Sequence, residues 1–424
     1  MASNSSVMFD LPPLPTYTLV RREPVLPPIP DSILALILPI VAYWTLSMFY
    51  HFIDVNDYFP QYRLHTPVEL LKRNKVTRWE VVRDVVLQQI VQTIAGMALS
   101  YFDEEEFTGK DEYNVAVWAR RIRIAQKVLP RILALFGFDA LGIAKNVSRH
   151  GYTVLGGAIA GGSYPGLTQS IMLDGVKATA PAFAGWEMAT ANFIYWYFIP
   201  TLQFAWAIGV LDTWQYFLHR AMHLNRWLYV TFHSRHHRLY VPYAFGALYN
   251  HPVEGFLLDT AGTGVGFLTS MMTNRQAMWY FTFSTIKTVD DHCGYAFPWD
   301  PLQHLTSNNA AYHDVHHQSW GIKNNFSQPF FIFWDRIMGT QWTGDVKLRY
   351  ERGREAAQKK ADMEADETSR TPSNLSSGES MTVSTADSAD SNARSRLRRK
   401  TASLSPHVDT LKGAKHGVRS VFQA

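Results

Sequence analysis

Histidines gather in three short boxes in the second half of the chain, and imidazoles at such spacing are typical of metal ligands. The chain has 16 histidines, and eight of them lie in the segments HRAMH, HSRHH and HDVHH, namely His219, His223, His233, His236, His237, His313, His316 and His317. Residues three and four apart lie on one face of an α-helix, so we expect each box to aim its imidazoles in one direction. A structural zinc ion takes about four ligands, and twice that number of imidazoles predicts two metal ions.

The chemistry of such a site depends on the metal, and imidazole suits iron, copper, nickel and zinc alike. A redox metal with O2 would cleave an unactivated C–H bond, which side-chain acids and bases cannot do. Two alternatives remain. The histidines are either ordinary structural residues, which three clusters so close together disfavour, or the ligands of a membrane metal transporter. Transporters place ligands near the middle of their spans, whereas these boxes lie among Arg, Asn and Asp at the ends of apolar segments.

Apolar segments must position the boxes. Residues 33–53 contain no Asp, Glu, Lys or Arg over 21 positions, about the length that crosses a bilayer core. Seven prolines lie between Leu11 and Pro30, with no short basic region or cleavage site, so we predict a permanent span and no cleaved signal peptide. Residues 193–214 are again apolar, with Asp212 as the only charge, and lead directly into His219. The first box therefore lies at a membrane exit.

Two other apolar regions leave the topology open. Residues 85–102 either span the membrane or lie in the interface, because glutamines interrupt them and basic loops on both sides favour the same cytoplasmic face. Residues 256–272 and 277–289 are each shorter than the roughly 20 residues of a full span, so we predict a re-entrant or tilted hairpin. Gly262 and Gly266 have the spacing of a close helix contact within it.

These patterns predict an all-α fold, an integral membrane helical bundle with a cytosol-facing helical cap that carries the boxes. We divide the chain into a proline-rich segment (1–32), a membrane region with connecting loops (33–190), a catalytic domain (191–345) and a polar C-terminal tail (346–424), which we predict to be disordered. Basic residues with hydroxyls in 394–403 favour contact with anionic lipid, unless the tail is merely solvated. One cysteine excludes an internal disulfide, and a net charge of +4 speaks against nucleic-acid binding.

The three boxes, together with NHPVEG (250–255) and DHCGYAFPW (291–299), resemble the fatty acid hydroxylase superfamily of histidine-box membrane di-iron oxygenases. The resemblance covers about residues 212–342. Within the superfamily, residues 72–89 and LDTWQYFLHRAMH look most like the fungal sphinganine C4-hydroxylases. Sterol C4-methyl oxidases and C5-desaturases carry similar boxes and are the alternative.

The resemblance implies a monooxygenase with two iron ions that hydroxylates C4 of sphinganine (dihydrosphingosine) or dihydroceramide, giving phytosphingosine-type bases. Electrons would come from NADPH through a cytochrome b5-type donor and its reductase. It also implies a multi-pass protein of the endoplasmic reticulum membrane with the boxes facing the cytosol. No catalytic residue is expected beyond the metal ligands.

Carried over by position, the resemblance implies ligands at the eight box histidines and at His292. His251 is a further candidate that either binds metal or caps a helix, with Glu254 as its expected hydrogen-bond partner. Three acidic residues beside the ligands either orient imidazoles or are solvated: Asp290, Asp291 and Asp314. Four arginines around the boxes suit either the docking of an acidic electron donor or a cytoplasmic membrane flank: Arg220, Arg226, Arg235 and Arg238.

Overall fold

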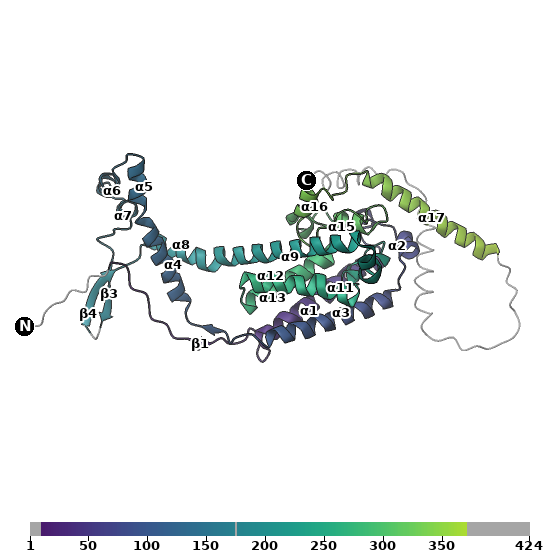
Figure 1. The fold of residues 1–424 in the computed structure, drawn as a ribbon, viewed down its shortest axis with the longest axis horizontal. Helices are drawn as coiled ribbons and strands as arrows, with labels where there is room; N and C mark the ends of the chain where they lie inside the picture. Colours follow the sequence, from purple (N-terminus) through teal and green to yellow (C-terminus); the bar gives the residue numbers. More distant parts are fainter. Residues whose placement is uncertain (1–9, 174–175, 371–424) are drawn as a thin grey trace, which may run out of the picture. The chain divides into compact units, whose positions relative to one another are not determined.

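The structure is a computed structural model that describes residues 10–173 and 176–370. The chain divides into two compact units, one made of Met1–Asp31 and Phe102–Trp206 and the other of Ser32–Tyr101 and Ala207–Ala424. Figure 1 shows the elements of both units. In the described residues regular structure is mainly helical, which agrees with the predicted fold class.

The unit that contains residues 102–206 combines short helices with two small sheets. Its described elements are β1 (Val20–Arg21), β2 (Phe107–Thr108), α4 (Asp111–Gln126), α5 (Leu129–Leu135), α6 (Ala140–Arg149), α7 (Thr153–Ile159), β3 (Thr168–Leu173), β4 (Val176–Pro181), α8 (Gly185–Phe193) and the π-helix η2 (Ile194–Phe198). β1 pairs with β2, and β3 with β4, both antiparallel. Arg123 of α4 forms a buried ion pair with Glu187 of α8, with Nη2 and Oε2 2.6 Å apart. The sequence analysis predicted neither sheet.

The unit that contains the histidine boxes is built from helices. Its described elements are α1 (Asp31–Val55), η1 (Pro60–Tyr62), α2 (Pro67–Arg73), α3 (Arg78–Ser100), α9 (Ile199–Leu224, from Ala207 on), α10 (Arg226–Leu228), η3 (Tyr229–His233), η4 (His236–Arg238), η5 (Ala244–Gly246), α11 (Pro252–Gly255), η6 (Phe256–Ala261), α12 (Gly262–Ser270), α13 (Asn274–Asp291), α14 (Leu302–Leu305), α15 (Ala310–His317), α16 (Phe333–Met338) and α17 (Val346–Arg370). The predicted region 33–190 is thus divided between the two units.

Local sequence signals start several of these helices. Threonine capping boxes begin α2 (Thr66 with Glu69), α3 (Thr77 with Glu80) and α13 (Thr273 with Gln276). In each, the threonine side chain accepts a backbone N–H that the helix leaves unpaired, and the third residue of the helix returns a hydrogen bond to the threonine backbone. Asn309 caps α15 in a related way, because its side chain accepts the N–H of Tyr312. The last histidine box therefore has a fixed helix start.

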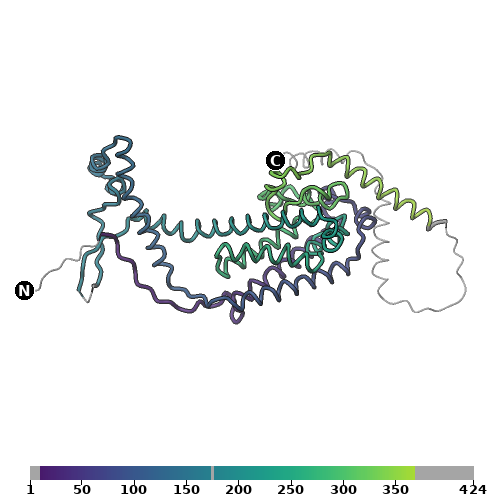
Figure 2. Tube along the Cα trace, viewed as in Figure 1, coloured from purple at the N-terminus to yellow at the C-terminus, as the bar shows by residue number. Residues whose placement is uncertain are grey.

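The core of this unit packs α1 and α3 against the segments that follow the second histidine box. Tyr43 and Tyr50 of α1, Val85 of α3, Phe245 and Tyr295 are all buried in one hydrophobic cluster. Polar contacts join the same elements, since the hydroxyl of Tyr43 donates to the carbonyl of Phe245 at 3.0 Å. Figure 2 shows α1 and α3 running side by side. The first apolar segment therefore helps to hold the box region, although it lies far away in sequence.

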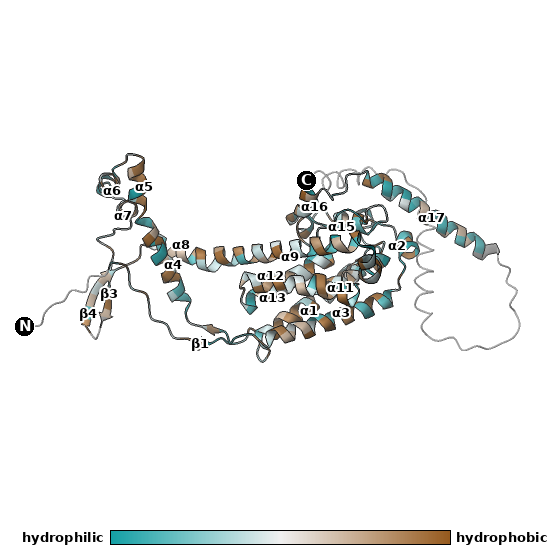
Figure 3. Ribbon diagram, viewed as in Figure 1, coloured by the Kyte–Doolittle hydropathy of each residue, from teal (hydrophilic) through white to brown (hydrophobic). Residues whose placement is uncertain are grey.

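Two helical runs in the described residues are long and apolar enough to cross a membrane, Asp31–Val55 and Gly185–Leu224. Only 28% and 11% of their most apolar windows are buried inside the structure, so most of their apolar surface faces outward, as expected for contact with lipid. Figure 3 shows the hydrophobic colour along both runs. Most of the stretch 85–102 lies in α3, which ends at Ser100, is not one of these two runs and buries Gln88 and Gln89.

The predicted hairpin appears as α12 and α13, which are joined by a short turn. Gly266 allows the close approach that the sequence indicated, because a Cβ atom there would lie 2.5 Å from the hydroxyl of Tyr280 and 2.9 Å from the carbonyl of Ala207. A Cβ atom at Gly262 would lie 2.7 Å from the ring of Trp214. The predicted small-residue contact is confirmed, and it brings α12 against both α9 and α13.

The start of the polar C-terminal segment differs from the prediction. Residues 346–370, expected to be disordered, form α17, and the remaining tail, including 394–403, lies outside the described residues. Apart from Ala357, which is buried, and Tyr350, whose ring packs on those of His65 and Trp320, the helix is mainly hydrophilic, as Figure 3 shows. Polar contacts hold α17 against α2 and its surroundings. Arg354 donates to the carbonyl of Leu64, and Lys72 pairs with Glu364.

Candidate metal centre

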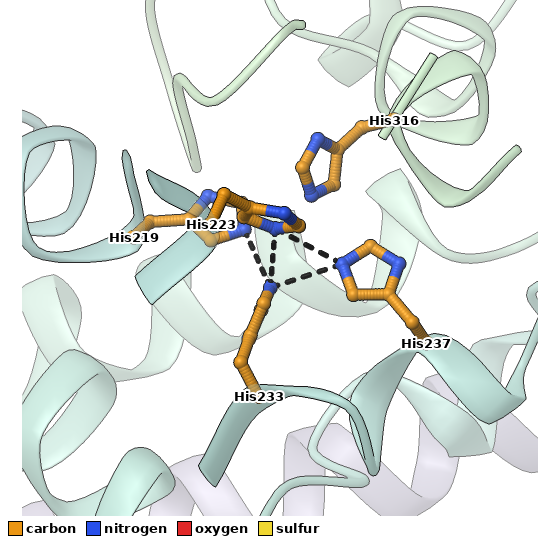
Figure 4. A group of neighbouring side chains, drawn as sticks. All are labelled: His219, His223, His233, His237 and His316. Carbon is orange, nitrogen blue, oxygen red and sulfur yellow. Dashed lines mark hydrogen bonds between the residues drawn. The ribbon is translucent and has the colours of Figure 1, made fainter. Parts of the chain in front are cut away.

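Five histidines from all three boxes converge in one buried cluster, the five-histidine group. Its members are His219, His223, His233, His237 and His316. One ligand atom from each lies within 4.8 Å of the others, and the Nε2 atom of His233 is 2.6 Å from that of His223 and 3.0 Å from that of His237. Figure 4 shows the five rings around a common centre.

Four more histidines form a second buried cluster, the four-histidine group. Its members are His236, His292, His313 and His317. The Nε2 atom of His313 lies 3.1 Å from those of both His292 and His317. The two groups are neighbours, since the ring centroids of His237 and His317 are 5.2 Å apart. Nine of the ten histidines proposed from the sequence are thus brought together.

The first box keeps both of its histidines in the five-histidine group, as expected, but the second and third boxes divide theirs between the two groups, which differs from the expected single direction for each box. His313 and His317 are four residues apart on α15 and share the four-histidine group, whereas His316 points into the five-histidine group. Successive helix residues are rotated by about 100° around the axis, so adjacent histidines face different centres. The second box behaves alike, because the chain changes from the π-helix η3 to the 3₁₀-helix η4 between His233 and His236.

Hydrogen bonds fix which ring nitrogen faces each group. The Nδ1–H groups donate outward to backbone carbonyls: His219 to Phe326, His236 to Tyr249, His292 to Thr288, His316 to Asn324 and His317 to Leu239, at 2.7–3.1 Å. The Nδ1 atom of His233 instead contacts the carboxylate of Glu254. A neutral imidazole with its proton on Nδ1 carries a lone pair on Nε2, which is the form that binds a metal.

Burial keeps these imidazoles neutral. It lowers the pKa of His236 to about 4 and that of His292 to about 3. The pKa values of His233, His313 and His317 are lowered well below the usual value for the same reason. Metal ligands must be deprotonated, so the rings are ready to bind a cation at neutral pH.

Without a cation, the arrangement leaves buried lone pairs in conflict. The Nε2 atoms of His219 and His233 lie 3.0 Å apart although the Nδ1 atoms of both rings are held by the Phe326 carbonyl and by Glu254. Among the described residues the buried Nε2 atom of His316 has no hydrogen-bond partner. A metal ion in each group would accept these lone pairs and remove the conflict. The donor set, all neutral imidazole, fits iron, copper, nickel or zinc. The residues present therefore fit a metal centre.

His251 lies outside both groups. Its Nδ1 atom accepts the N–H of Val253 and so caps α11, one of the two roles that the sequence left open. Glu254 accepts the backbone N–H of His251 with one carboxylate oxygen, but its other oxygen contacts the ring of His233. Glu254, the expected partner of the His251 ring, therefore contacts the ring of His233 instead.

The three acidic residues beside the clustered histidines neither orient their rings nor face solvent. In the part of the chain that the structure describes, Asp291 pairs with Lys287, Asp290 accepts from Tyr50, and Asp314 contacts His65 and Tyr350. All three carboxylates are buried. Asp290 ties α13 to α1, and Asp314 ties α15 to His65, just before α2, and to α17, whereas the Asp291–Lys287 pair lies within α13. These carboxylates therefore support the centre through the backbone.

His65 is a residue of the site that the sequence analysis missed. Its Nε2 atom lies 2.9 Å from Oδ2 of Asp314, and its Nδ1 atom lies 3.1 Å from Oε1 of Glu69. Burial lowers the pKa of His65, but the two carboxylates outweigh burial and raise it to about 9. No histidine lies near it in the sequence, so ligand spacing gave no signal, although the capping box of Thr66 and Glu69 is visible from residue types.

Comparison with known proteins gives results that agree with this geometry. Residues 204–340, which include all three boxes, match the family model for fatty acid hydroxylase. The chain is 42% identical over 330 residues to sphingolipid C4-hydroxylase SUR2 of Saccharomyces cerevisiae, which covers 78% of this chain and 77% of the relative. It is 37% identical over 326 residues to sphinganine C4-monooxygenase 1 of Arabidopsis thaliana, covering 77% of this chain and 94% of the relative.

The similarity to a sterol enzyme is narrower. Methylsterol monooxygenase 1 of Rattus norvegicus is 37% identical over 148 residues, which is 34% of this chain and 48% of the relative. No solved structure matches the chain.

Proposed function

This chain belongs to the fatty acid hydroxylase family, and from that premise we propose that it is a membrane monooxygenase that hydroxylates C4 of a sphingoid base. The substrate is sphinganine or its N-acylated form, and the product is a phytosphingosine-type base. One atom of O2 enters the C4–H bond and the other leaves as water, with the two electrons taken from NADPH. The relatives named for this activity are similar over about three quarters of the chain.

One observation carries the chemistry, the meeting of two histidine groups in a buried centre. We propose that each group holds one iron ion, with the nine clustered histidines as ligands and His251 outside the set. When bound, the two iron ions supply the O2 chemistry that an unactivated C–H bond requires. The outward Nδ1–H bonds orient the rings, and Glu254 orients His233 in the same way. Burial of all nine imidazoles keeps bulk water away from the reacting centre.

The apolar helices determine how the substrate arrives. The outward apolar surfaces of α1 and of the run Gly185–Leu224 contact lipid, so the alkyl chain of the substrate enters from the bilayer. We place the protein in the endoplasmic reticulum membrane as a multi-pass protein with a helical cap that faces the cytosol. The exposed Arg226 and Arg238, which flank the boxes, support this orientation.

The electrons come from another protein in this proposal. A cytochrome b5-type donor, reduced from NADPH by its reductase, would approach the cytosolic face. Arg226 and Arg238 are exposed there and complement an acidic donor surface.

Two alternatives receive less support. The sterol-enzyme relative covers only 34% of the chain, whereas the sphingoid-base relatives cover more than twice that share. A metal transporter would hold ligands in the middle of a span, but His219 and His223 lie in the last two turns of α9.

Reconstitution tests the function directly. The purified protein in lipid nanodiscs receives sphinganine, O2, NADPH, a cytochrome b5-type donor and its reductase, and mass spectrometry identifies the product. We expect the wild-type product to be a base with one added oxygen at C4. The variants His219→Ala, His236→Ala and His316→Ala should form none of this product. A wild-type protein that leaves sphinganine and dihydroceramide unchanged but oxidises a methylsterol would overturn the proposal.

A further inference from the structure

A small cavity of about 20 Å³ opens beside both histidine groups. Its lining includes His233 of the five-histidine group and His236 and His292 of the four-histidine group. Asp259 and Asn250 line the same cavity. This volume holds a group about the size of one water molecule or of an ammonium group, so an ammonium group placed there would contact both histidine groups and these polar side chains at once.

Asp259 differs from the other carboxylates of this cavity. Glu254 contacts the His233 ring and Asp291 pairs with Lys287. Asp259 is held by neutral amides alone, with Oδ2 2.6 Å from Nε2 of Gln88 and 3.2 Å from Nδ2 of Asn250. Within residues 10–173 and 176–370, no lysine or arginine forms an ion pair with it.

A partly buried carboxylate without a cation is costly, because it has lost water and gained no opposite charge. Amide donors position it but do not neutralise it. A cationic group that enters the cavity would supply the missing charge. The cavity therefore favours a ligand with an ammonium group over a neutral ligand of the same shape.

We propose that Asp259 binds the ammonium group of the free sphingoid base and so makes sphinganine, and not its N-acylated form, the preferred substrate. This inference rests on the proposed function. A primary alkyl amine is protonated at neutral pH, like that of lysine. In sphinganine the amine is on C2, two carbons from C4, so an amine held at Asp259 keeps C4 close to the cavity that His233, His236 and His292 line. N-acylation replaces the cation by a neutral amide and removes the ion pair.

The test compares substrates that differ in charge. Wild-type protein, Asp259→Asn and Asp259→Glu are reconstituted with the electron donors and given sphinganine, N-methylsphinganine, which is bulkier but still cationic, and N-acetylsphinganine, which is neutral. In Asp259→Asn we expect KM for the two cationic substrates to rise about 10- to 100-fold with kcat nearly unchanged, since a hydrogen bond to a charged group has this range of free energy. KM for N-acetylsphinganine changes little, and Asp259→Glu keeps part of the preference for cations.

Asp300→Asn is the matched control. Asp300 is also partly buried in this unit and accepts a hydrogen bond from Tyr50, but it is not in the cavity lining. It should leave the substrate preference unchanged. An equal loss of activity toward charged and neutral substrates in Asp259→Asn, or an unchanged KM for sphinganine, overturns the inference. If wild-type protein hydroxylates none of the three, the proposed function fails instead.

A binding measurement on wild-type protein needs no variant to fold. Sphinganine and N-methylsphinganine should raise the unfolding midpoint of the purified protein more than N-acetylsphinganine does, because at equal concentration a ligand that binds the folded state more tightly stabilises it more. Equal stabilisation by all three ligands contradicts a charge-selective site.

Discussion

His65 and Asp314 lie 249 positions apart in sequence, yet Nε2 of His65 is 2.9 Å from Oδ2 of Asp314, inside the last histidine box. The contact joins the start of α2 to α15. Tyr350 of α17 donates to the same carboxylate. Three elements from both ends of the described chain therefore meet at one residue between two proposed iron ligands, His313 and His316.

The His65 contact predicts a pH dependence of stability. The pKa of His65 is raised from 6.5 in the unfolded chain to about 9 in the folded protein. A raised pKa gives a stabilisation that is fully present below pH 6.5 and lost as the pH rises through 9, and a shift of this size corresponds to roughly 3 kcal/mol. We expect the unfolding midpoint of wild-type protein to fall between pH 6.5 and 9, and to fall much less in His65→Gln. Parallel curves for the two proteins would contradict the assignment.

The division into two histidine groups predicts a metal stoichiometry. Iron-loaded wild-type protein should contain about two ions per chain. His223→Ala removes a ligand from the five-histidine group and His292→Ala removes one from the four-histidine group, so each variant should approach about one ion. His304→Ala, which changes an exposed histidine outside both groups, should retain two. Elemental analysis by mass spectrometry measures the iron content of the wild-type protein and the three variants. Normal iron content in both His223→Ala and His292→Ala would contradict the assignment.

Glu254 is expected to affect catalysis without acting on substrate. Its carboxylate contacts Nδ1 of His233 and fixes the orientation of that ring. Glu254→Gln should lower the rate or the iron affinity about 10- to 100-fold, the usual range for partners of metal-bound histidines. Glu80→Gln changes a half-buried capping glutamate of α3 that lies outside both histidine groups, and it should leave both values near those of wild type. Comparable losses in the two variants would point to a general effect on folding.

Gly266 should tolerate no side chain. Alanine there would meet the hydroxyl of Tyr280 and the backbone of Ala207, and overpacking of this kind costs about 1–3 kcal/mol. Gly264 lies on the same helix, and a Cβ atom there would have no neighbouring atom within 4 Å, so Gly264→Ala is the matched control. We expect Gly266→Ala alone to lower the unfolding midpoint and the amount of protein recovered. Equal midpoints would show that α12 shifts freely.

Tyr350 connects α17 to the metal centre. Tyr350→Phe removes the hydrogen bond to Asp314 and should destabilise the protein by about 1 kcal/mol. Tyr58→Phe, at an exposed tyrosine, should have no measurable effect. Chemical unfolding of both variants provides the comparison. An unfolding midpoint of Tyr350→Phe equal to that of wild type would show that the contact of α17 with Asp314 does not stabilise the protein.

The sequence predicted the residues of the centre better than their arrangement. Imidazole spacing indicated the three boxes, and the resemblance added His292. The assignment of His233 and His236 to different groups accompanies the change from π- to 3₁₀-helix between them, for which no residue type gives a signal. The clustered histidines were therefore predictable as a list but not as two sets.

Long-range polar contacts explain most of the other differences. Asp314 has its partners in α2 and α17, and neither is near it in sequence. Residues 346–370 have a composition typical of disorder, and they form α17 where tertiary contacts such as that of Arg354 with Leu64 are available. The apolar segments were easier to predict, because hydrophobic length depends on the segment alone.

The place of His219 and His223 in the last two turns of α9 also bears on which carbon is oxidised. The preceding residues of this helical run are apolar and largely uncovered, so on the proposed function they sit at the depth of the acyl chains. The length of the helix thereby sets the depth of the reactive centre in the bilayer, at the level of the first few carbons of a lipid. Regioselectivity near the head group, with the distant methyl end out of reach, follows from where this helix stops.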